Sequence, residues 1–329
     1  MTSVPGLTWV IGSGGLLGQS VESAMVGAMD QTGSGADIWR PPEPIAWSGP
    51  SAGAVDLRHR AGEFLRAADD RPWSVVWCAG SGVTGTSADA LQLELAALGE
   101  TLDALAATPR AREGAFFFAS SAGGVYAGVG SPPYDESSPV RALAPYGQAK
   151  LDAEAMVTAW GQRTGTPALI GRIANLYGPG QNLEKAQGLI SQICRTHLTG
   201  QPVSIYVSLD TLRDYLFAPD CAGLIVEGLA RLRAEQSAGL PTVVTKILAS
   251  QRAITIGAVL GEMGRIFKRP PRVVLGASAM SAMQARDLSL RSRVWPELDR
   301  RSITPFPVGV AMTAADLLRR LQDGAVGPS

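Results

Sequence analysis

Short apolar runs alternate with longer helical patterns through the first half of the chain, and this order constrains the fold most. The first run lies at 7–12 and is followed by apolar residues at helical spacing. The later runs lie at 37–40, 74–80, 115–120 and 167–175. Such alternation is typical of parallel strands joined by helices. We therefore predict an α/β fold built on a doubly wound parallel sheet.

A glycine-rich turn, VIGSGGLLGQSV, joins the first apolar run to the first helical stretch. Gly12, Gly15 and Gly18 have the spacing G-x-x-G-x-x-G, with Leu16 and Leu17 between them. Glycines permit a tight turn and close approach of a pyrophosphate, and the helix N-terminus adds N–H donors and partial positive charge. Because the turn lies between a strand and a helix, we interpret these five residues as the cofactor-binding turn of a Rossmann-type sheet. A purely structural turn is the alternative.

The end of the second apolar run normally decides which nicotinamide cofactor is bound. An acidic residue there binds the ribose 2′-hydroxyl, whereas an arginine accommodates a 2′-phosphate. Arg40 stands near that position, and Asp37 lies too early in the run. We favour NADP(H) over NAD(H), while an ordinary surface role for Arg40 stays equally open.

The pattern becomes irregular in the second half of the chain. We assign residues 1–178 to an NAD(P)-binding Rossmann domain. The chain is expected to return to that domain near 203–228 and 241–265. Residues 179–202 and 266–329 then form a smaller substrate-binding lobe, largely C-terminal.

A tyrosine precedes a lysine by four residues in the segment APYGQAK. On a helix, Tyr146 and Lys150 would share one face. A free phenol has a pKa of about 10, and a nearby ammonium lowers the pKa of a phenol toward the range useful in acid–base catalysis. The apolar run at 115–120 delivers Ser120 and Ser121 at its C-terminal end, where open α/β sheets bind their ligands. The tyrosine–lysine pair is therefore a candidate for chemistry and not only a helix surface.

Taken together, these motifs resemble the extended short-chain dehydrogenase/reductase family of nucleotide-sugar epimerases, dehydratases and ketoreductases. The resemblance runs from residue 7 to about residue 265. It is carried by the glycine turn, DL at 56–57, VVWCAG, SSAGGVY, PYGQAK, NLYGPG and RDYLFAPD. Each motif alone is weak, but the combination is highly specific.

The resemblance implies roles for single residues. Tyr146 would be the catalytic acid/base, Lys150 would hold the nicotinamide ribose and stabilise the phenolate, and Ser121 would hydrogen-bond the reacting sugar oxygen. Ser120 is the fallback for that serine. The further cofactor contacts that it implies are Asp56 at the adenine, Leu57, Ala79 and Gly80.

The resemblance also implies an anchor for the substrate diphosphate. Asn175 and Arg213 match positions that hold it, and an arginine fork suits phosphate oxygens. Lys185 is a further candidate, although a loop lysine is more often only solvated.

Departures from the family pattern narrow the reaction. The 4,6-dehydratases carry an Asp–Glu pair where this chain has Ala122 and Gly123, so dehydration is disfavoured. The cysteine and histidine of the GDP-fucose-forming reductase-epimerases are missing, with Gly180 in the histidine-bearing loop. In the helix after VVWCAG, Glu94 stands where the family usually has an asparagine, and it has no evident role.

Of the reactions that the resemblance implies, simple hydride transfer at C4 of a nucleotide-linked hexose is the one left. We favour an NADPH-dependent 4-ketoreductase because of Arg40, with a 4-epimerase that retains NAD as the alternative. A catalytically silent dinucleotide-binding module is the remote alternative. Retention of Ser121, Tyr146 and Lys150 argues against it.

Charge and composition exclude several other classes. A formal net charge of zero and a pI near 6.8 give no reason to expect nucleic acid or an anionic membrane as a partner. The three cysteines and two histidines are isolated in the sequence, so we expect neither disulfides nor a metal site. Without a visible signal peptide or membrane-spanning run, a cytoplasmic location is expected, and a homodimer is the assembly considered.

Overall fold

The computed structural model describes residues 6–32, 37–47, 52–80, 82–83, 85–183, 188–239, 243–276 and 284–324. Its centre is a six-stranded sheet with the strand order β2-β1-β3-β4-β5-β9, in which every neighbouring pair is parallel. The strands are β1 (Leu7–Ile11), β2 (Asp37–Trp39), β3 (Trp73–Trp77), β4 (Gly114–Ser121), β5 (Ala168–Ile173) and β9 (Val243–Leu248). The predicted Rossmann-type α/β fold is confirmed.

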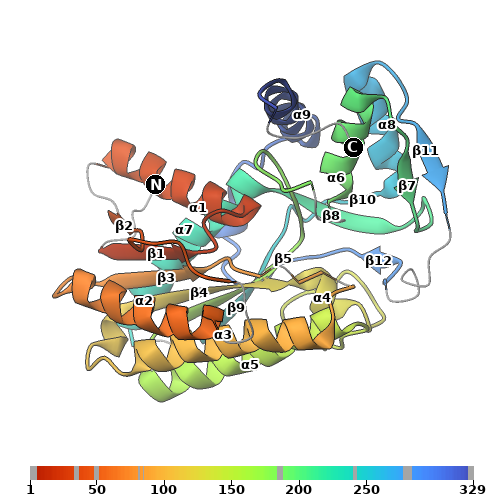
Figure 1. The fold of residues 1–329 in the computed structure, drawn as a ribbon. Coiled ribbons are helices and arrows are strands. Elements are labelled where there is room, and N and C mark those ends of the chain that lie inside the picture. Colours follow the sequence, from red (N-terminus) through yellow and green to blue (C-terminus); the bar gives the residue numbers. More distant parts are fainter. Residues whose placement is uncertain are drawn as a thin grey trace.

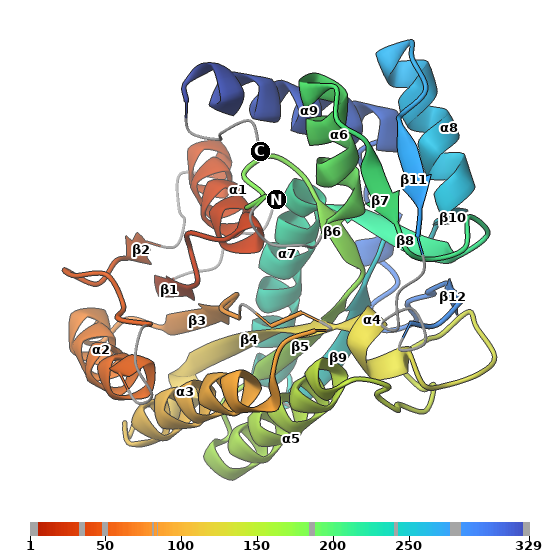
Figure 2. The ribbon, with the colours of Figure 1, turned by 45° about the vertical axis from the view of Figure 1, so that its right-hand side comes forward.

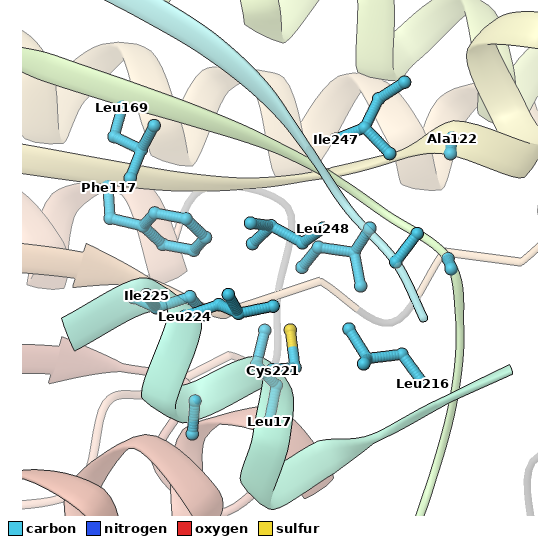
Figure 3. Close-up of a cluster of buried hydrophobic side chains, with 14 of the residues drawn as sticks. Leu17, Phe117, Ala122, Leu169, Leu216, Cys221, Leu224, Ile225, Ile247 and Leu248 are labelled. Atoms are coloured by element: carbon cyan, nitrogen blue, oxygen red, sulfur yellow. The ribbon is translucent and has the colours of Figure 1, made fainter. Parts of the chain in front are cut away.

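Helices cover both faces of this sheet (Figure 1). One face carries α2 (Ala52–Ala68), α3 (Ala88–Ala106) and α5 (Pro145–Thr164), and the other carries α1 (Leu16–Thr32) and α7 (Ala218–Ser237). Along β4, Phe116 and Phe118 point into the core under α2, α3 and α5. Phe117 points to the opposite core, where it packs with Leu224 and Leu248 (Figure 3). Burial on both faces explains why the strands read as continuous apolar runs.

A second group of elements lies beside the carboxyl ends of the main strands (Figure 2). It contains a four-stranded sheet and a two-stranded sheet. The strands are β6 (Asn175–Tyr177), β8 (Leu212–Phe217), β10 (Ala253–Thr255) and β12 (Asp287–Leu288), and, as a separate pair, β7 (Val203–Ile205) and β11 (Val273–Leu275). The helices are α6 (Leu189–Thr199), α8 (Ile256–Phe267) and α9 (Phe306–Gln322).

The return of the chain to the main sheet differs in detail from the expectation. Strands β7 and β8, within the predicted return at 203–228, lie in the smaller sheets, and so do β6, within the predicted domain 1–178, and β10, within the predicted return at 241–265. Helix α7 and strand β9 therefore make the return. The division into a cofactor domain and a substrate lobe stays a prediction.

The short helix α4 (Ala122–Tyr126) packs closely against the start of α5. A Cβ on Gly147 would lie 2.3 Å from the carbonyl oxygen of Gly124 and 2.9 Å from the Cβ of Ala142. Only glycine at position 147 lets the two helices approach this closely.

We expect Gly147→Ala to destabilise the protein by about 1–3 kcal/mol, because the added methyl group must push α4 away from α5. Gly261→Ala is a matched control, since a Cβ on that helical glycine meets nothing within 4 Å. The control should gain about 0.4–1 kcal/mol. Urea unfolding measures both, and a Gly147→Ala variant as stable as the parent would refute the close-contact argument.

Candidate functional site

A cavity of about 560 Å³ opens at the carboxyl ends of the central strands. Six of the predicted site residues line it: Gly12, Gly15, Ala79, Gly80, Tyr146 and Lys150. Other lining residues include Trp47, Gly53, Ala54, Cys78, Glu94 and Phe118. The cavity thus joins the glycine turn to the tyrosine–lysine pair, as a dinucleotide site requires.

In the glycine turn, the backbone of Gly12, Gly14 and Gly15 lines the cavity directly. Gly12 has φ +89°, and a Cβ there would lie 2.6 Å from the backbone nitrogen of Ala79. A Cβ on Gly18 would lie 2.3 Å from the carbonyl oxygen of Gly12, so α1 starts directly against the turn. A Cβ on Gly14 meets nothing within 4 Å, which leaves that backbone open to a ligand. The side chain of Leu17 is buried in the core, so only backbone groups at that position could reach a phosphate. These features fit a pyrophosphate.

The side chain of Lys150 is held in place at one end of the cavity. Its Nζ donates a hydrogen bond to the carbonyl oxygen of Ala119, at 3.0 Å. The same atom lies 5.0 Å from the ring centroid of Phe118 and 5.9 Å from that of Tyr146. The ammonium therefore lies beside the phenol, as the helical spacing predicted.

The two serines at the end of β4 have different surroundings. Ser121 caps α4: its Oγ accepts a hydrogen bond from the Gly124 N–H at 3.1 Å. The ring of Tyr146 and the Cβ of Ser121 both lie against Gly124, at 3.3 and 3.5 Å from the position of its missing Cβ. Ser120 is buried and donates to the Glu154 carboxylate at 2.5 Å. Ser121 is the serine that lies next to the phenol.

A buried ionic network lies immediately behind Ser120. Arg172 on β5 forms a bidentate ion pair with Glu154 on α5. Its Nη2 donates to the Glu154 Oε2 at 2.7 Å, and its Nε donates to both carboxylate oxygens. Arg172 also donates to the Tyr126 hydroxyl at 2.8 Å. Burial disfavours the arginine charge, but the hydrogen bonds and attraction of Glu154 outweigh it and raise the pKa of Arg172. The network joins β4, β5, α4 and α5 around the candidate site.

Asn175 and Arg213 lie outside the cavity lining, on neighbouring strands β6 and β8. The Asn175 Oδ1 and the Ser121 Oγ both lie near Gly123, since each would be 4.0 Å from a Cβ on that glycine. The hydroxyl of Tyr215 hydrogen-bonds Asn175. Tyr215 and Arg213 share one face of β8. A path of polar side chains thus leads from Ser121 toward Arg213.

The guanidinium of Arg213 is buried with neutral partners. It donates to the carbonyl oxygen of Leu212 at 2.8 Å and to the Gln284 Oε1 at 3.3 Å. Burial lowers its pKa. Among the ion pairs of the described residues, none involves Arg213. A buried cation of this kind favours an anionic ligand. Lys185, the other predicted anchor, lies outside the described residues.

Arg40 is already paired in this structure. Its Nη2 lies 2.7 Å from the Glu22 Oε2 of α1, and its side chain is 64% exposed. It does not line the cavity.

Asp56 and Leu57 are placed differently from what the resemblance implied. Both lie within α2 and outside the cavity lining, and Leu57 is part of the core. Asp56 accepts a hydrogen bond from the Ala46 N–H at 3.0 Å and lies 3.3 Å from the Nε of Arg60. The assignment of an adenine contact to this pair is not supported by their positions. Trp47, which the sequence did not single out, lines this end of the cavity.

Glu94 also lines the cavity. It accepts a hydrogen bond from the Gly82 N–H at 3.0 Å. A Cβ on Gly80 would lie 3.4 Å from its Oε2 and 3.8 Å from the Lys150 Nζ, so the carboxylate and the ammonium flank the same glycine. Glu94 therefore accepts from the backbone at Gly82 and lies near Lys150, at the edge of the cavity.

The described residues also bear on metal binding and membrane insertion. No group of three His, Cys, Asp or Glu side chains there is arranged to hold a metal ion. No helix in the described part of the chain is long and apolar enough to span a membrane.

Comparisons with known proteins identify the family of this chain. The family model "NAD dependent epimerase/dehydratase family" matches residues 11–240. A dTDP-L-rhamnose 4-epimerase of Burkholderia thailandensis is 35% identical over 98 residues, which are 30% of this chain and 27% of that relative. A dTDP-glucose 4,6-dehydratase of Haemophilus influenzae is 33% identical over 92 residues, 28% of this chain and 26% of the relative. The matched stretches thus span about a quarter of each of these relatives.

Similarity of fold extends over almost the whole chain. The structure of the Thermus thermophilus UDP-glucose 4-epimerase in complex with NAD has a TM-score of 0.75 at 19% identity. The superposition covers 97% of this chain and 99% of that one. The family match, which covers most of the chain, confirms the resemblance: this chain belongs to the NAD-dependent epimerase/dehydratase family, the nucleotide-sugar group of the extended short-chain dehydrogenases/reductases.

Proposed function

We propose that this chain is a nucleotide-sugar 4-epimerase that retains NAD(H) and oxidises and re-reduces C4 of the hexose. The observation that carries the proposal is the placement of Tyr146 and Lys150 side by side at the cavity, with Ser121 against the same turn of α4. A silent binding module would have no need to hold these three side chains together.

Each of the three side chains has a defined task in this proposal. A bound nicotinamide cofactor would supply the hydride acceptor and donor. Tyr146 would remove the proton of the C4 hydroxyl and later return it, and the Lys150 ammonium would stabilise the phenolate. The Ser121 Oγ uses a lone pair to cap α4, so its own proton remains to hydrogen-bond the sugar oxygen.

The pairing of Arg40 favours the epimerase over the reductase. NADPH was predicted because the Arg40 guanidinium could bind a 2′-phosphate. In this structure Glu22 already pairs with that guanidinium. Among the relatives, one is named a 4-epimerase and one a putative 4-epimerase, and others are named 4,6-dehydratases. Dehydration stays disfavoured, because Ala122 and Gly123 at the start of α4 carry no group that can move a proton.

An NADPH-dependent 4-ketoreductase is the second candidate. It is favoured by the exposure of Arg40, whose side chain is on the surface and can exchange Glu22 for a phosphate. An exposed pair of this kind contributes little, about 0–1 kcal/mol, so a 2′-phosphate could displace it.

The cofactor content of the purified protein separates the two candidates. An epimerase must keep its reduced cofactor through each cycle. We therefore expect NAD(H) to copurify, C4 epimers from a panel of UDP- and dTDP-hexoses to interconvert without added cofactor, and Arg40→Ala to change activity less than twofold. Stoichiometric oxidation of NADPH by a 4-keto sugar, with about tenfold or greater loss of NADPH affinity in Arg40→Ala, would establish the reductase instead.

Tyr146→Phe should lower kcat by about a hundred- to ten-thousandfold and leave cofactor affinity unchanged, because only the phenolic proton is lost. Lys150→Met should lower both turnover and cofactor affinity. Steady-state kinetics and cofactor titration check both variants. Near-normal turnover of the phenylalanine variant would rule out the mechanism.

Arg213→Ala should weaken binding of UDP or dTDP by about ten- to hundredfold, since a charged hydrogen bond to the diphosphate is lost. NAD(H) binding should not change. Arg286→Ala is the control in the same part of the molecule, because Arg286 is exposed and pairs with Asp210. Calorimetric titration of the nucleoside diphosphate is the measurement, and equal affinities of the two variants would place the diphosphate elsewhere.

A further inference from the structure

An exposed tryptophan lines the cavity at the end away from the catalytic pair. Trp47 is 51% exposed, and no other tryptophan of the described residues is classed as exposed. Trp47 precedes α2 in the chain, and Gly53 and Ala54 in the first turn of that helix also line the cavity. A Cβ on Gly53 would be 3.6 Å from the indole Cε3, so the ring lies against the first turn of that helix. A large aromatic surface is therefore left open inside a cavity that the catalytic pair also lines.

The backbone before this indole is tied to α2. The Ala46 N–H donates to Asp56, and Asp56 pairs with Arg60, whose side chain is only 8% exposed. Arg60 also pairs with Glu43, which precedes the tryptophan in the chain, and with Glu63 on α2. These contacts hold the segment that carries Trp47 in a fixed position.

The order of the strands determines what lies next to Trp47. Across the sheet the order is β2-β1-β3-β4. The catalytic pair lies by the end of β4, the glycine turn follows β1, and Trp47 follows β2. A dinucleotide with its nicotinamide at Tyr146 and its pyrophosphate on the glycine turn thus extends its other base toward Trp47.

We propose that Trp47 is the stacking surface for the adenine ring of the cofactor. This inference rests on the proposed cofactor site. It replaces the adenine contact that the resemblance assigned to Asp56, which instead acts as a positioning residue for Trp47. Leu57, the neighbouring predicted cofactor contact, belongs to the core. Stacking on an indole accepts the π face of any purine and is independent of the ribose 2′ substituent. The purine end of the site therefore binds adenine without selecting NAD or NADP.

Fragments of the cofactor test this directly. ADP-ribose carries the adenine but no nicotinamide, and NMN carries the nicotinamide but no adenine. In protein freed of copurified cofactor, calorimetry should show ADP-ribose binding weakened by about ten- to hundredfold in Trp47→Leu and largely restored in Trp47→Phe. NMN binding should be equal in all variants. Val55→Ala, an exposed apolar residue of α2 outside the cavity lining, should bind both fragments as the parent does.

The outcomes separate the inference from the proposed function. If the parent binds NAD(H) and ADP-ribose, and Trp47→Leu binds ADP-ribose within twofold of the parent, the stacking role is overturned while the cofactor site stands. If the parent binds neither NAD(H) nor ADP-ribose, the cofactor site itself is wrong. Equal loss of NMN and ADP-ribose binding in Trp47→Leu would also overturn the inference, because it would indicate a general disturbance of the cavity.

Discussion

The geometry of the candidate site depends on one buried ion pair, that of Arg172 and Glu154. Glu154 lies one helical turn after Lys150 on α5, and Arg172 lies on β5 beside the end of β4. Their contact fixes the distance between the helix with the catalytic pair and the strand that ends in Ser121. Removal of one partner would leave a buried charge uncompensated, at a cost of about 3–5 kcal/mol. Ser120 completes the network from the strand side, which explains why the first of two adjacent serines is structural.

Local patterns of the sequence predicted the layers of the main sheet well. Strands buried on both faces are apolar throughout, and amphipathic helices lie between them, so each element can be recognised from its own residues. The tyrosine–lysine pair was predictable for the same reason, since one helix carries both residues. Strand β8 was not placed correctly because its apolar run looks like those of the main sheet. Its partners β6, β10 and β12 show that it belongs elsewhere, and two of them, β10 and β12, lie farther along the chain.

Features that depend on distant partners could not be predicted. Arg40 was correctly identified as the cation at the end of β2, but its partner Glu22 lies on another element. Lys246 lies in an apolar run and is fully buried, because Asp299 and Ser292 come to it from the C-terminal segment. Trp47 was overlooked because nothing in its neighbouring residues shows that it faces a cavity. In each case the missing information is a contact across the fold.

The position of β9 at the edge of the main sheet has a consequence for how the chain acquires its structure. Strand β9 pairs with β5, but β6, α6, β7, β8 and α7 lie between them in the chain. During synthesis β5 therefore leaves an unpaired edge until β9 has emerged, and such edges are prone to pairing with other chains. Strands β6 and β8, which pair in the smaller sheet, both precede β9 in the chain. The main sheet is completed after β6, β7 and β8 have been synthesised but before β10, β11 and β12, so the two parts of the molecule are built in overlapping order.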